Sequence, residues 1–166
     1  MIRKTGVGIT AALDYTDSYT NQVVYIFKPK PLVNIKLEFF IALINSRVYY
    51  FYLTKSFGEL EWRSHPYLTQ SQILSLPVPD IYSEENQYRI RELTNLVKLY
   101  LKNNRITPEI DVKIESLIGK MFGLSVEDYK IIFELITSSE ELIPIKELKN
   151  ISLETLSRQL EHTDGL

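Results

Sequence analysis

The second half of the chain repeats a helical pattern of apolar residues, and this pattern most constrains the fold. Apolar residues recur every three or four positions across residues 84–103, and again from Ile110 to Met121. Thr107 followed by Pro108 is a typical helix start, and Gly123 is a typical helix end. Ser125, followed by acidic residues, predicts the start of a third helix. We therefore expect an up-and-down bundle, with a weaker helix after Ser152.

The first half alternates between strand-like and helix-like patterns. Residues 6–13 and 22–28 are short β-branched and aromatic runs separated by a polar stretch, which predicts two antiparallel strands. Residues 35–55 carry apolar side chains at helical spacing around a wide face, which predicts one long buried helix. Residues 56–67 have no period and are expected to form a loop, whereas 69–74 fit one or two helical turns.

Together these patterns predict an α+β fold. A small mixed lobe with antiparallel strands and a long buried helix is followed by a helical bundle. The two prolines of Leu76-Pro77-Val78-Pro79-Asp80 form a rigid exit, so we place the boundary there. The expected domains are a mixed target-recognition lobe at residues 1–80 and a helical lobe at residues 81–166.

Composition excludes several kinds of chemistry. The 166 residues contain no cysteine, which excludes disulfides, cysteine-ligated metal and thiol catalysis, and they contain only two histidines. No apolar run is long enough to span a membrane, and the first residues lack the pattern of a signal peptide, so a cytoplasmic protein is expected. Short fragments such as Gly6-Val7-Gly8 and Glu147-Leu148-Lys149 lack the partners that a nucleotide loop or a metal nuclease requires. We therefore expect no catalytic residues and no metal site.

Charge and aromatic residues are unevenly distributed. Residues 1–66 contain eight bases and five acids, a net charge of +3, whereas the remainder has 11 bases and 16 acids, a net charge of −5. Of the 19 aromatic residues, 13 lie within residues 1–67. Cations neutralise phosphates and planar groups contact bases, so this half favours a nucleic-acid partner.

The expected DNA contacts fall into two groups. Contacts to phosphates, which position the protein without reading sequence, are predicted for Arg3, Lys4, Lys28, Lys30 and Lys55. Contacts to base edges are predicted in the aperiodic loop, for Arg63, His65, Trp62 and Tyr67. Arginine can donate two hydrogen bonds to guanine, and loss of such a pair costs about 1–3 kcal/mol for the matched base. Asn45 and Ser46 are assigned to structure, since buried polar side chains usually bond a neighbouring loop.

Three short motifs in order carry a family resemblance. Leu43-Ile44-Asn45-Ser46, then Tyr67-Leu68 leading to the Leu-Pro-Val-Pro exit, and finally the run from Ile118 to Asp128 resemble the C-terminal specificity domain of TaqI-like N6-adenine DNA methyltransferases and type IIG restriction-modification enzymes. The resemblance covers about residues 1–136.

This resemblance implies a domain that recognises sequence in double-stranded DNA. A separate methyltransferase or restriction catalytic domain, in cis or in trans, would bind S-adenosylmethionine and flip the target adenine. The Asn/Asp-Pro-Pro-Tyr/Phe motif of that catalytic domain is not in this chain, so no cofactor is expected here. The alternative is a protein–protein interaction module with no nucleic-acid ligand, whose aromatic residues form the partner surface.

Overall fold

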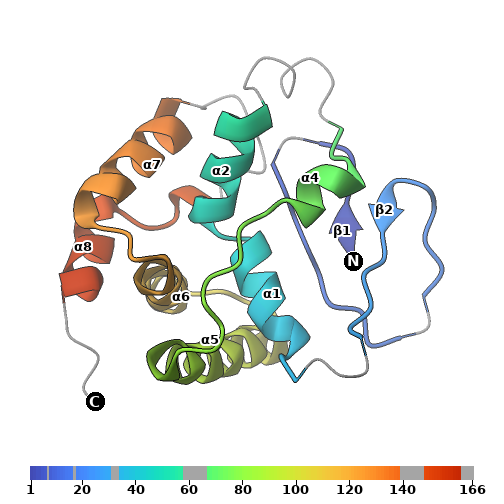
Figure 1. The fold of residues 1–166 in the computed structure, drawn as a ribbon, viewed down its shortest axis with the longest axis horizontal. Helices are drawn as coiled ribbons and strands as arrows, with labels where there is room; N and C mark the ends of the chain where they lie inside the picture. The colour runs from blue at the N-terminus through green and yellow to red at the C-terminus, as the bar shows by residue number, and fades with distance from the viewer. Residues whose placement is uncertain (7, 17, 31–33, 58–66, 139–147, 162–166) are drawn as a thin grey trace.

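The computed structural model is mostly helical, with a small antiparallel sheet near the N-terminus (Figure 1). It describes residues 1–6, 8–16, 18–30, 34–57, 67–138 and 148–161. Within these residues there are seven helices and two strands, which confirms the predicted mixture of a small strand-containing part and a helical part. Among the helices described, none is both long and apolar enough to cross a membrane.

The described residues between 1 and 30 form an extended layer, which we call the N-terminal layer. Its sheet pairs β1 (Ile2–Arg3) with β2 (Val24–Tyr25), antiparallel and with Ile2 opposite Tyr25. The other edge of β1 bonds to the returning chain, since the Arg3 N–H donates to the Thr10 carbonyl and the Ala12 N–H to that of Met1. The regular strands are shorter than predicted, and the first precedes residues 6–13. Gly6 and Gly8, both at positive φ, turn the chain there.

The single long helix predicted over residues 35–55 is wrong. The structure has two helices, α1 (Leu37–Ile44) and α2 (Arg47–Phe57). At the break, the Asn45 side chain accepts from the Ala11 N–H at 2.8 Å and donates to the Ala11 carbonyl at 2.9 Å. The Ser46 hydroxyl accepts from the Tyr49 N–H and so caps α2. The structural assignment of Asn45 and Ser46 is confirmed, because they end one helix and begin the next.

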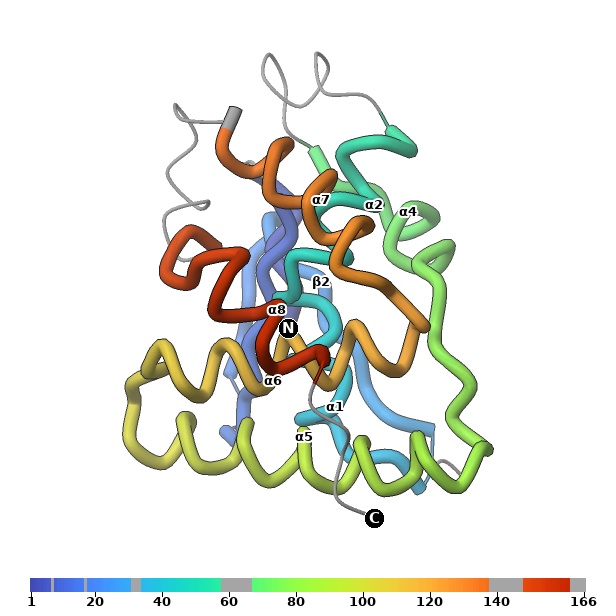
Figure 2. Tube along the Cα trace, turned by 90° about the vertical axis from the view of Figure 1, so that its left-hand side faces the viewer, coloured from blue at the N-terminus to red at the C-terminus, as the bar shows by residue number. Residues whose placement is uncertain are grey.

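Most other helices begin and end near the residues that sequence signals predicted. They are α4 (Gln70–Leu74), α5 (Glu84–Asn103), α6 (Pro108–Phe122), α7 (Val126–Ser138) and α8 (Leu153–Glu161). The Thr107 hydroxyl caps α6, and Gly123 ends it in the left-handed conformation at φ 67°. We call residues 81–161, which contain α5 to α8, the helical half. Figure 2 shows α5 and α6 side by side, with α7 and α8 stacked above them.

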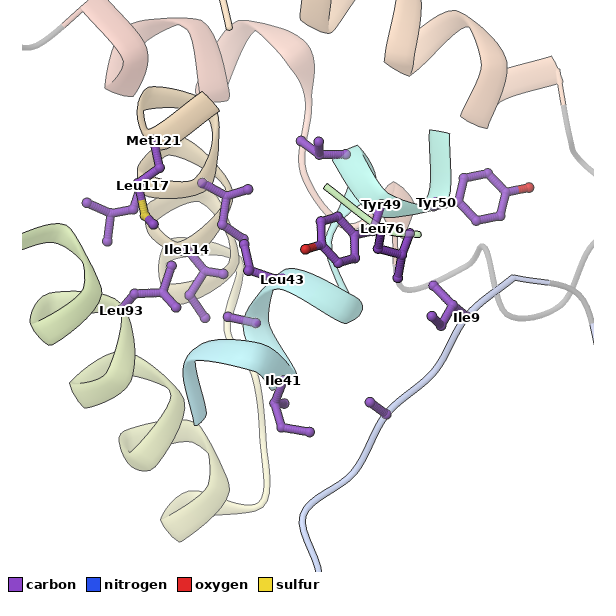
Figure 3. Packing of buried hydrophobic residues seen from close by; sticks show 14 of the residues in the cluster. Ile9, Ile41, Leu43, Tyr49, Tyr50, Leu76, Leu93, Ile114, Leu117 and Met121 are labelled. Atoms are coloured by element: carbon purple, nitrogen blue, oxygen red, sulfur yellow. The ribbon is translucent and has the colours of Figure 1, made fainter. Parts of the chain in front are cut away.

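One hydrophobic core joins the N-terminal layer to the helical half. Leu43 of α1, Leu93 of α5 and Leu117 of α6 are almost fully buried in the same cluster (Figure 3). Ile9 belongs to this cluster too, on the side of the N-terminal layer. The core therefore runs continuously across the boundary predicted at residue 80.

Candidate nucleic-acid interface

Polar residues of the N-terminal layer meet Tyr67, which lies just before α4 in the sequence. The Lys4 ammonium lies 4.3 Å from the centre of the Tyr25 ring, a cation–π contact. Tyr67 pairs with Thr5 through a β-bridge, and the Leu68 N–H donates to the Lys4 carbonyl at 2.7 Å. The Tyr67 side chain is still 52 % exposed. Two of the predicted DNA contacts, Lys4 and Tyr67, are thus neighbours.

Tyr25 links this group, because its ring contacts Lys4 and its hydroxyl hydrogen-bonds with Tyr67. Desolvation raises the pKa of Tyr25, and a hydrogen bond with Tyr67 raises it further. The phenol therefore stays protonated at neutral pH and can act as a donor. We call Lys4, Tyr25 and Tyr67 the tyrosine–lysine cluster.

Lys4 lies beside the start of β2, whereas Lys28 and Lys30 follow its end. The Lys4 N–H bonds to the carbonyl of Val23, five residues before Lys28, and five extended residues span up to about 17 Å. Both lysines are exposed, and they line an apolar groove of about 350 Å³ with residues of α1 and α4. Lys4 and the pair Lys28 and Lys30 therefore lie at opposite ends of β2.

The other predicted contacts differ in accessibility. Arg3 is half-buried in β1, and its guanidinium lies against Gly6, where an added Cβ would be 3.0 Å from the Arg3 Cζ. Lys55 is exposed in the last turn of α2, where a cation is favoured by the helix dipole. Trp62, Arg63 and His65, and also Glu147, lie outside the described residues, so their roles stay predictions.

Arg47 was counted among the bases of the front half, but the structure buries it. Its guanidinium is 1 % exposed and forms a bidentate pair with Asp111, with both N–O distances at 2.9 Å. It also donates to Glu115 at 3.1 Å and to the carbonyl of Leu148 at 2.8 Å. Burial by itself lowers the pKa of Arg47, but the bonds to Asp111 and the charge of Glu115 raise it overall.

Glu115 extends this buried network to α7. The Tyr129 hydroxyl donates to both the backbone carbonyl and the carboxylate of Glu115, at 3.0 and 3.2 Å. Burial raises the pKa of Tyr129 well above its ordinary value, so the phenol remains a donor. The only sequence signal was a pair of acids at i, i+4 beside the apolar stripe of α6.

The buried network reduces the charge asymmetry at the surface. Without Arg47, residues 1–66 have seven bases and five acids, a net charge of +2. Without Asp111 and Glu115, the remainder has 11 bases and 14 acids, a net charge of −3. The front half remains the more basic of the two, but by a smaller margin than its composition indicated.

Comparisons with known proteins give no family for this chain. No family model, curated protein or solved structure matches the chain. Within the part of the chain that the structure describes, no three His, Asp or Glu residues are grouped so as to hold a metal ion.

Proposed function

We propose that this chain is a DNA sequence-recognition domain of a restriction-modification or adenine methyltransferase system. In this role it positions a separate catalytic domain on duplex DNA, and S-adenosylmethionine binds to that catalytic domain. A cytoplasmic location accompanies the role, because the DNA and the catalytic partner lie there.

The tyrosine–lysine cluster carries the proposal. Lys4 supplies a cation and Tyr67 an exposed tyrosine side chain, and both kinds of side chain commonly donate to DNA phosphates. In the sequence, Tyr67 also follows the predicted base-reading residues His65 and Arg63 by two and four positions. Phosphate contacts beside a recognition segment would fix its register on the duplex.

The proposal is tested by titrating fluorescent duplex DNA at two salt concentrations. We expect binding in the micromolar range or tighter, weakening as salt rises because phosphate contacts release counterions. Lys4→Gln should weaken binding to all sequences alike and reduce the salt slope by roughly one unit. Lys102→Gln, an exposed lysine at the end of α5, is the matched control and should leave binding unchanged. Absence of any salt-dependent binding by the wild-type chain would refute the proposal.

The apolar groove favours the second candidate function, a protein–protein interaction module. Leu74 and Val78 at the groove are both more than half exposed, as is typical of partner surfaces. For such a module, Leu74→Ser should abolish capture of a catalytic partner, and duplex DNA should show no salt-dependent binding.

A further inference from the structure

A second groove, with a more polar lining than the first, lies between the start of α1 and the first half of α5. It has a volume of about 700 Å³, and its described lining includes two cations, Lys36 and Arg91. Three carboxamide side chains and the exposed ring of Tyr82 also line it. None of the described residues lining this groove is acidic. The lining therefore presents hydrogen-bond donors and positive charge without a competing carboxylate.

Neither cation is engaged by another described side chain. By contrast, several cations of the helical half form ion pairs, such as Arg89 with Glu85, Lys113 with Glu92 and Lys130 with Glu127. The side chains of Lys36 and Arg91 are exposed and make no hydrogen bond or ion pair within the described chain. Their charge is consequently available to an anion.

The donors around these cations are held in place by local bonds. The Tyr82 N–H donates to the Asp80 carboxylate at 2.9 Å, which fixes the turn that presents the 86 % exposed ring. Gln87 donates through its amide to the carbonyl of Ile81. Asn95, one turn beyond Arg91 on α5, is exposed beside it. Tyrosine hydroxyls and carboxamides, like lysine and arginine, are donors that proteins use on DNA phosphates.

We propose that this groove binds the sugar–phosphate backbone of duplex DNA, which extends the DNA-binding surface from the N-terminal layer onto α5. The inference rests on the proposed function, and it adds Lys36, Arg91 and Tyr82 as phosphate contacts. The groove is continuous with the lysine group described above. A small hollow shares Pro29 and Ile35 with the apolar groove of Lys28 and Lys30, and shares Ile35 and Lys36 with the polar groove.

Two acids line the connecting hollow, and neutralising one of them provides a test with the opposite expected sign. Glu38, in the first turn of α1, and Asp14 both line it. A carboxylate beside a phosphate track repels the DNA, so removing that charge should strengthen binding. Glu38→Gln is therefore expected to bind duplex DNA severalfold more tightly, whereas Glu134→Gln on α7 should not.

The main experiment compares two double variants of equal charge change. Lys36→Gln with Arg91→Gln removes both cations from the groove, and Lys98→Gln with Lys102→Gln removes two exposed cations from α5 outside it. Each chain is titrated with fluorescent duplex DNA over a range of salt concentrations. The groove variant should lose roughly tenfold in affinity at low salt and about two units of salt slope, whereas the control keeps both.

The outcomes separate this inference from the proposed function. If the groove variant binds like its control while Lys4→Gln weakens binding, the groove inference is rejected and the proposed function stands. If the wild-type chain does not bind duplex DNA, both are rejected. If a mononucleotide competes as effectively as duplex DNA at equal phosphate concentration, the groove takes a free phosphate and the inference is also overturned.

Discussion

The N-terminal layer and the helical half are held together by different kinds of contact. In the N-terminal layer the regular ladder is only two residue pairs long, and backbone bonds to remote segments complete it. In the helical half, side chains a few residues away cap the helices, as Thr107 does for α6 and Ser125 for α7. Local signals therefore specify the helical half, whereas the N-terminal layer depends on partners far along the chain.

The buried network is the exception within the helical half, because it joins α6 to Arg47 of α2. We expect Arg47→Met to cause the largest loss, about 3–5 kcal/mol in the free energy of unfolding, since two buried carboxylates lose their partner. Urea denaturation measures this loss. Arg158→Met, which removes an exposed pair with Glu154, is the control and should change stability little.

A companion variant distinguishes lost packing from unpaired charge. Combining Arg47→Met with Asp111→Leu and Glu115→Met removes all three charges, so much of the lost stability should return. If the single and triple variants are equally unstable, this explanation is contradicted, and the lost stability comes from packing and not from unpaired charge.

Asn45 bonds the N-terminal layer to the junction of α1 and α2, so its removal should affect the N-terminal layer more than the helical half. Asn45→Ala leaves the N–H and carbonyl of Ala11 without their partner, at a cost of about 1–3 kcal/mol. Hydrogen exchange should accelerate at Arg3 and Ala11 before it does in α5 and α6. The exposed Asn103→Ala is the control, and equal acceleration throughout the chain would refute the expected separation.

Gly123 tests a local signal of the helical half. Its φ of 67° strains any residue with a Cβ, but an added Cβ would meet nothing within 4 Å. We expect Gly123→Ala to cost about 1 kcal/mol in thermal or urea unfolding, and Gly123→Asn to cost less because asparagine tolerates this conformation. Equal costs for the two variants would show that the left-handed backbone is not the cause.

The smallest expected effect is a pH dependence at the start of α7. The Ser125 side chain and N–H bond to the Asp128 carboxylate and lower its pKa below the ordinary 3.8. A lowered carboxyl pKa stabilises the fold above pH 3.8, and this contribution is lost as pH falls through the folded-state value. Asp128→Asn should therefore be less stable than wild type at neutral pH, with the difference shrinking in acid. A difference independent of pH would contradict this assignment.

The predictions from sequence succeeded where the determining residues are close together. Thr107, Pro108 and Gly123 mark helix ends, and the structure has them there because caps act within one helical turn. The same reasoning failed over residues 35–55, where the apolar spacing continues through a helix break. It also counted Arg47 among the bases available in the first half, because the acids that bury it follow more than 60 residues later.

The sequence by itself determined that the second half is helical, that α6 runs between Thr107 and Gly123 and α7 follows Ser125, and that the first half is richer in bases and rings. Only the tertiary structure decided that α1 stops at Asn45, that Arg47 is internal and that Lys36 and Arg91 share a groove. The physical reason is the distance along the chain over which each interaction acts. A cap or an apolar stripe acts between neighbours along the chain, whereas burial and charge pairing depend on which distant segments the folded core brings together.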